Sequence, residues 1–126
     1  MGYVKCGTEA NLSLTEMVQA GIDIRTVCTL PLILDGACGW GDPMHVNRTI
    51  RMSEAAGFSA IEIEDQILPK RAHHHIGIEH IIPTDAMVAK IREAVAGRRD
   101  PNFFIIARTN AARMHGIDEA LRRGEA

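Results

Sequence analysis

The chain has 126 residues, which suits a single domain over residues 1–126. Its 14 basic and 16 acidic side chains give a formal net charge of -2, which excludes a cationic surface for nucleic acid or an anionic membrane. The three cysteines form no CxxC pair and no apolar run approaches the roughly 20 residues of a membrane span, so we expect a cytoplasmic protein.

Short apolar runs alternate along the chain with longer patterns of helical period. Ser13 and Glu16 have the spacing of a capping box, and Asp42 followed by proline marks a second helix start. Thr84 or Asp85 is a candidate cap for a third helix. In chain order, the patterns predict a helix at 14–25, a strand at 32–34, a helix from 43 to 57, a strand at 60–64, a helix at 84–97, a strand at 103–107 and a helix at 118–123.

Helices that alternate with strands in this way indicate parallel strands joined by right-handed crossovers, and therefore an α/β fold. Three strands are too few for a closed barrel, since a (β/α)8 barrel needs about 250 residues. We therefore predict part of a (β/α)8 (TIM) barrel, with about three parallel strands. The strands at 32–34 and 103–107 read as buried, and the strand at 60–64 has a period of two. Such a sheet exposes unpaired edges, so we expect the chain to form a homo-oligomer.

Each predicted strand leads into polar side chains: Asp35 after the first, Glu64 at the end of the second, and Arg108 after the third. The carboxyl ends of parallel strands share one surface, and binding sites are built there. Two carboxylates suit a hard cation such as Mg²⁺, and a guanidinium suits a carboxylate or phosphate. The pattern predicts Asp35 and Glu64 as metal ligands and Arg108 as a substrate-binding residue for a small carboxylic acid.

The same three side chains also have plainer roles that the sequence leaves open. Asp35 can accept backbone N–H groups in the turn that follows it. Glu64 and Arg108 can form a salt bridge between neighbouring strands.

The turn after the first strand contains three glycines around Trp40. Backbone amides in such a turn can approach an anion closely, and we predict that Gly39 and Trp40 contact the substrate. Cys38 lies in the same turn. No histidine is placed by sequence to activate its thiol, so we expect it to be packed rather than nucleophilic.

The long loop after the second strand contains Lys70, Arg71 and three consecutive histidines at 73–75, with His80 nearby. Zinc ligands are usually separated by about two to five residues, so adjacent histidines seldom bind one ion. Three interpretations remain open: a zinc or nickel site, a single histidine that reaches the substrate, and histidines in solvent.

Four segments in the same order resemble the isocitrate lyase and phosphoenolpyruvate mutase superfamily. Residues 34–41 resemble its DxDxGYG turn, 63–66 its IEDQ segment, 69–71 the start of PKKCGH, and 106–111 ARTDA. The resemblance extends from about residue 11 to 126 and implies that the chain spans a central part of the family's barrel.

The resemblance implies a usually oligomeric barrel that binds Mg²⁺ or Mn²⁺ at its strand ends. Members of the family cleave or form C–C or P–C bonds in small 2-oxo and 2-hydroxy acids through an enolate. By the same match Asp35 would face the metal, Glu64 would hold metal-bound water, and Arg108 would bind the substrate. We therefore expect a metal-dependent lyase that cleaves a C–C bond, with a P–C mutase or hydrolase as the alternative.

The chain also departs from the family pattern. Ala37 stands where the turn has its second aspartate, and Ala72 stands where the lyase branch has its cysteine. His74 matches the motif histidine and Lys70 can match the lysine of the mutase branch, so we predict these two as catalytic residues. The two alanines leave open a non-catalytic remnant that binds a partner through its open sheet.

Overall fold

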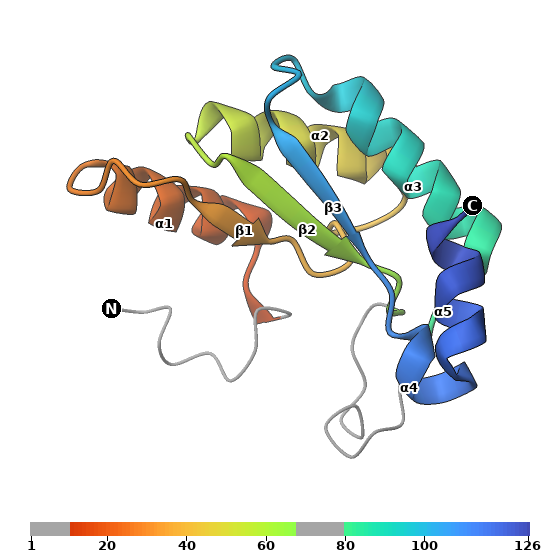
Figure 1. The fold of residues 1–126 in the computed structure, drawn as a ribbon. Helices are drawn as coiled ribbons and strands as arrows, with labels where there is room; N and C mark the ends of the chain where they lie inside the picture. Colours follow the sequence, from red (N-terminus) through yellow and green to blue (C-terminus); the bar gives the residue numbers. More distant parts are fainter. Residues whose placement is uncertain (1–10, 68–79) are drawn as a thin grey trace.

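The computed structural model describes residues 11–67 and 80–126, so the predicted catalytic residues Lys70 and His74, and histidines 73–75, lie outside the described part. In chain order the elements are α1 (Leu14–Arg25), β1 (Ile33–Asp35), α2 (Pro43–Ala55), β2 (Ala60–Glu64), α3 (Thr84–Gly97), β3 (Phe104–Arg108), α4 (Ala111–His115) and α5 (Ile117–Gly124) (Figure 1). Sequence patterns predicted all of these except α4. No helix in the described ranges has the length and apolar character needed to span a bilayer.

The three strands form one parallel sheet in the order β1-β2-β3, which confirms the predicted α/β architecture. Helices α2 and α3 lie side by side against one face of this sheet (Figure 1). The register pairs Asp35 with Glu62 across the first two strands and Glu64 with Arg108 across the last two. The carboxyl ends of all three strands therefore meet at one edge.

The hydrophobic core lies between the sheet and the helices that cover it. Its buried members are Leu34, Val46, Ile50, Ile61, Ile63, Ala94 and Phe103. Because successive side chains of a strand point to opposite faces, the strand residues between these members point away from the helices.

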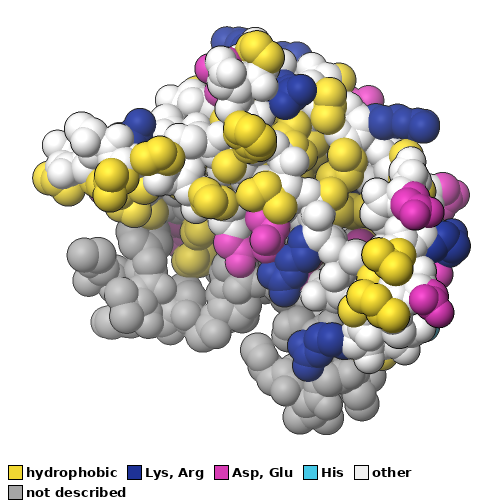
Figure 2. Space-filling view, in the orientation of Figure 1, with side chains coloured by type: hydrophobic (Ala, Val, Ile, Leu, Met, Phe, Trp, Pro, Cys, Tyr) yellow, Lys and Arg dark blue, Asp and Glu magenta, His cyan; other side chains and the backbone are white. Residues whose placement is uncertain are grey.

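The other face of the sheet is not covered by any described element. Ile33 and Phe104 are 65% and 70% exposed, and Figure 2 shows hydrophobic side chains gathered over the strands. The prediction that β1 and β3 are buried strands is therefore wrong for the described chain. Each of these strands pairs with only one other strand, and helices cover only one of its faces. Only β2, paired on both sides, is buried along most of its length.

Two of the three predicted helix starts are confirmed. The Ser13 hydroxyl accepts the Glu16 N–H at 3.2 Å, and the Glu16 carboxylate accepts the Ser13 N–H at 2.7 Å. The Asp42 side chain accepts two N–H groups at the start of α2. The side-chain cap predicted at Thr84 or Asp85 is absent, because a proline occupies the cap position and α3 already begins at Thr84.

Gly36 brings the turn after β1 into backbone contact with β2. Its N–H donates to the Glu62 carbonyl at 2.8 Å, and the Ala37 carbonyl accepts the Glu64 N–H at 2.8 Å. A β-carbon on Gly36 would lie 2.6 Å from the Glu62 carbonyl oxygen. These contacts continue the pairing of β1 and β2 past Asp35, so they fix the position of the turn that follows this carboxylate.

We expect Gly36→Ala to lower the free energy of unfolding by about 1–3 kcal/mol, because its methyl group would collide with backbone that cannot move aside. Urea unfolding of the 126-residue chain measures this loss. Gly124→Ala is the matched control, since a β-carbon there meets nothing within 4 Å. Equal stability of the two variants would contradict the close approach at Gly36.

Candidate active site at the strand ends

Charged side chains gather where the strands end on the uncovered face of the sheet. Residues two apart on one strand share a face, so Glu62 and Glu64 point to the side away from the core. The register places Asp35 beside Glu62 and Arg108 beside Glu64. Glu62 was missed by sequence reasoning, although its position two residues before Glu64 was a signal that the two share a face.

Arg108 is the cation of this cluster. Its Nη1 donates to Glu62 Oε1 at 2.9 Å, and its Nη2 lies 3.5 Å from Glu64 Oε2. The hydrogen bond to Glu62, followed by the charges of Glu64, Glu62 and Asp35, raises the pKa of Arg108 above its ordinary value. The salt bridge between Glu64 and Arg108 that the sequence left open is therefore present, but Glu62 is the nearer partner. The Arg108 side chain stays 45% exposed, which leaves it accessible to a ligand.

Glu64 is a buried carboxylate that an amide orients. Its side chain is 2% exposed, and its Oε2 accepts a hydrogen bond from Asn110 Nδ2 at 2.9 Å. Arg108 Nη2 in turn donates to Asn110 Oδ1 at 3.4 Å. Asn110 therefore contacts both predicted site residues, a role that the sequence did not assign to it.

Asp35 lies at the exposed end of β1. Its Oδ1 accepts the Ala37 N–H at 2.9 Å, which is the plainer role that the sequence left open. The charge of Asp35 also acts on Arg108, so the two belong to one electrostatic cluster.

The carboxylates fit a hard divalent cation in the manner that Mg²⁺ prefers. Mg²⁺ is usually bound through one or two carboxylates, with water and substrate oxygens completing its shell. Asp35 and Glu64 offer such donors on one face, and the surrounding carboxylates outnumber the single guanidinium. Within residues 11–67 and 80–126, no group of three or more His, Cys, Asp or Glu side chains is arranged to hold a metal ion.

The turn over 36–41 uses its own polar groups internally. The Gly39 N–H donates to the Gly36 carbonyl at 2.8 Å, and the Gly39 carbonyl accepts the Thr49 hydroxyl at 3.0 Å. The Trp40 indole N–H donates to the Leu12 carbonyl at 2.9 Å. Contact of Gly39 and Trp40 with a substrate therefore stays a prediction, and these bonds show what holds the turn in shape.

Lys90 supports the same turn from α3. Its side chain is buried, its Nζ donates to the Cys38 carbonyl at 2.9 Å, and burial lowers the pKa of Lys90. The Cys38 thiol is itself fully buried, as expected for a packed cysteine. Sequence reasoning missed Lys90, which lies at helical spacing between Met87 and Ala94, two apolar residues on the covered side of α3.

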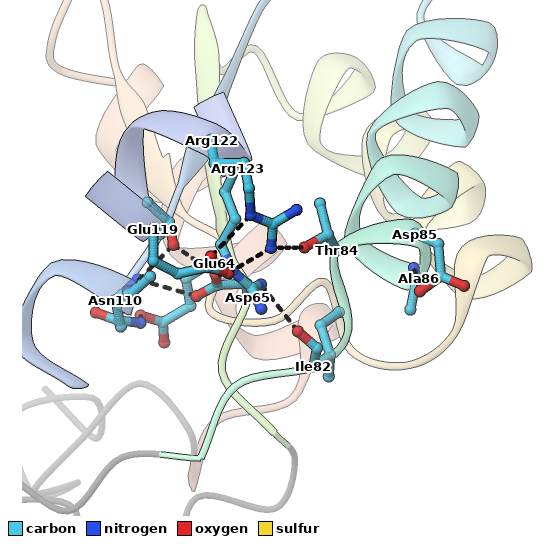
Figure 3. Close-up of polar contacts among 12 residues, drawn as sticks. Glu64, Asp65, Ile82, Thr84, Asp85, Ala86, Asn110, Glu119, Arg122 and Arg123 are labelled. Atoms are coloured by element: carbon cyan, nitrogen blue, oxygen red, sulfur yellow. Dashed lines mark hydrogen bonds and ion pairs between the residues drawn. The ribbon is translucent and has the colours of Figure 1, made fainter. Parts of the chain in front are cut away.

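Helix α5 brings further charges to this end of the sheet (Figure 3). Glu119 accepts hydrogen bonds from Arg122 Nη2 at 2.7 Å and from Arg123 Nε at 2.9 Å. These bonds, that of Arg122 first, lower the pKa of Glu119 to about 2. Arg123 also forms an ion pair with Asp65, so the charges of α5 connect to the residue that follows β2.

Comparisons of the sequence and of the fold with known proteins identify the same group of related enzymes. A family model described as phosphoenolpyruvate phosphomutase matches residues 5–126. The 2,3-dimethylmalate lyase of Eubacterium barkeri is 44% identical over 113 residues, which are 90% of this chain and 39% of that protein. The crystal structure of phosphoenolpyruvate phosphomutase from Streptomyces platensis subsp. rosaceus is 33% identical, with a TM-score of 0.84 over 91% of this chain and 40% of that one.

A second solved structure, phosphonopyruvate hydrolase in complex with oxalate and Mg²⁺, is also 33% identical, with a TM-score of 0.81 over 92% of this chain and 40% of that one. The chain thus spans about two fifths of the length of the proteins that it matches. These similarities bear out the prediction of a partial (β/α)8 barrel.

We expect acid to weaken the attachment of α5 through Glu119. Its pKa is lowered from 4.5 to about 2 in the folded chain, so the unfolded chain takes up the proton first. The stability that Glu119 contributes is present above about pH 4.5 and is lost as the pH falls toward 2. Glu119→Gln removes this contribution, so the melting midpoints of the two chains should differ at pH 6, and the difference should shrink steadily as the pH falls from about 4.5 toward 2. A constant difference across that range would argue against the ion pairs.

Proposed function

The chain belongs to the phosphoenolpyruvate phosphomutase family, and we propose that it supplies part of the active site of a metal-dependent lyase. The proposed reaction cleaves a C–C bond in a small 2-oxo or 2-hydroxy carboxylic acid through an enolate intermediate. The observation that carries this proposal is the cluster of Asp35, Glu62, Glu64 and Arg108 at the ends of three parallel strands. The name of a 44% identical relative, 2,3-dimethylmalate lyase, supports the same reaction class.

Mg²⁺ or Mn²⁺ is the proposed cofactor, with Asp35 and Glu64 as the residues that would hold it or its water. When bound, such a cation would offset the negative charge that develops as the C–C bond breaks. Asn110 keeps the Glu64 carboxylate in one orientation before any ligand arrives, so little rearrangement is needed when the cation binds.

Arg108 is the proposed binding group for the substrate carboxylate. A guanidinium presents two parallel donors to a carboxylate, and nearly half of this side chain is open to solvent. The substrate carboxylate would share the Arg108 guanidinium with Glu62 or displace the Glu62 carboxylate from it. Gly39 and Trp40 are proposed to line the same site, and proton transfer is proposed for His74 and Lys70, which lie outside the described residues.

A P–C bond mutase or hydrolase is the second candidate. The fold similarity to a phosphomutase and to phosphonopyruvate hydrolase favours it, since both share this part of the fold. Release of inorganic phosphate from phosphonopyruvate would identify the hydrolase, and conversion of phosphonopyruvate to phosphoenolpyruvate without release of phosphate would identify the mutase. Release of a keto acid from a substituted malate or citrate would identify the lyase.

We also propose a cytoplasmic homo-oligomer. The argument for assembly is the uncovered face of the sheet, where Ile33 and Phe104 are largely exposed, together with the edges of β1 and β3. Sedimentation at micromolar concentration tests it: a dilute, well-behaved monomer would count against assembly.

We expect the melting midpoint of the chain to rise when Mg²⁺ and oxalate are added together, because a ligand that binds only the folded state stabilises it. At one hundred times the dissociation constant, the gain is about 2.7 kcal/mol. Asp35→Asn should abolish the rise that depends on Mg²⁺. Asp23→Asn, the same change on an exposed carboxylate of α1, should leave it intact. An Asp35→Asn variant that responds like the parent chain would remove Asp35 from the metal site.

Arg108→Lys should weaken oxalate binding in the presence of Mg²⁺ by about tenfold, which corresponds to about 1.4 kcal/mol. The reason is that an ammonium group cannot reproduce the paired donors of a guanidinium. Titration calorimetry measures the affinity, and Arg48→Lys on the exposed side of α2 serves as the control. Unchanged affinity in Arg108→Lys would mean that the substrate carboxylate binds elsewhere.

A further inference from the structure

Asp65, the residue after β2, is a fully buried carboxylate with partners from two distant segments. Its Oδ2 accepts the Thr109 hydroxyl at 2.6 Å, and its Oδ1 accepts the Asn110 N–H at 2.9 Å. Its backbone N–H donates to the Arg108 carbonyl at 3.2 Å. Asp65 therefore fixes the path of the chain just after β3.

Arg123 of α5 supplies a positive charge to this buried carboxylate (Figure 3). Its Nη1 lies 3.1 Å from Asp65 Oδ2 and also donates to the Ile82 carbonyl at 2.9 Å. The Arg123 side chain is only 11% exposed, so water screens the ion pair weakly. Its Nε bond to Glu119 holds the guanidinium on its own helix.

A continuous series of bonds leads from Arg123 to the site. Asp65 holds the backbone of Asn110, and the Asn110 side chain donates to Glu64 and accepts from Arg108. The amide that orients both site residues is thus placed by a carboxylate whose charge is balanced from α5. A buried carboxylate that loses its counter-charge is strongly destabilised, so its hydrogen bonds to the segment after β3 would rearrange.

We propose that Arg123 is a positioning residue for the site at the strand ends. By balancing the charge of Asp65, it keeps Asn110 in the orientation that holds the Glu64 carboxylate against the Arg108 guanidinium. The structural part of this inference stands without a ligand, and its effect on binding rests on the proposed function.

The test uses Arg123→Lys and Arg123→Met in the 126-residue chain, with Arg122→Lys and Arg122→Met as matched controls. Arg122 lies on the same helix and donates to the same Glu119, but its other hydrogen bond goes to Thr84 instead of Asp65. Two quantities are measured well below every melting midpoint. One is the NMR signal and hydrogen exchange of the Asn110 side-chain amide without metal, and the other is oxalate affinity with Mg²⁺.

We expect Arg123→Met to shift the Asn110 amide signal, to speed its exchange at least tenfold, and to weaken oxalate binding at least tenfold. Arg123→Lys keeps the charge but loses the second donor, so a loss of about threefold is expected. The Arg122 variants should stay within twofold of the parent chain. If Arg123→Met fails to fold, the comparison of the two lysine variants decides the matter.

Two results would overturn the proposal. One is an Asn110 amide that behaves alike in the Arg123 and Arg122 variants. The other is an amide that moves in the Arg123 variants while oxalate affinity stays unchanged. If the parent chain itself binds no oxalate with Mg²⁺, the proposed function fails, and the amide measurement alone still decides whether Arg123 positions Asn110.

Discussion

The register of β2 against its two neighbours is the constraint on which the rest of the structure depends. The side chains of β2 alternate between the two faces of the sheet, so Ile61 and Ile63 enter the core and Glu62 and Glu64 lie on the uncovered face. A slip of one residue would exchange the two sets, placing carboxylates under the helices and isoleucines in solvent. One choice of register therefore forms the hydrophobic core and at the same time brings the carboxylates next to Arg108.

Local patterns in the sequence predicted every helix and strand except α4. They also predicted the edge of the sheet where the charged side chains gather. Asp35, Glu64 and Arg108 could be assigned to one edge because parallel strands share their carboxyl ends, and the structure brings them into one electrostatic cluster. The partner nearest to Arg108 was missed, since only the last carboxylate of the alternating strand, Glu64, was assigned to the site. The contact between Asp65 and Arg123 joins residues far apart in the chain, so no local spacing could indicate it.

Buried charges support this end of the sheet from two helices. Lys90 on α3 holds the turn after β1 through the Cys38 carbonyl, while Arg123 on α5 balances Asp65 after β2. Each charge is costly to bury, and each has specific partners that make the burial tolerable. Such pairs add little net stability, but they restrict where the strand ends can lie, which a site built from several strands requires.

The order of the strands in the sheet is also their order in the chain, and this affects how the molecule folds. Every strand pairs with the one next to it in sequence, but both pairings are parallel, so each must first close a crossover that contains a helix, and such contacts form slowly. The buried core cluster is complete by Phe103, whereas the cation that balances Asp65 arrives twenty positions later, at Arg123. During synthesis the core can therefore collapse first, and the strand ends reach their final arrangement only when α5 has emerged from the ribosome.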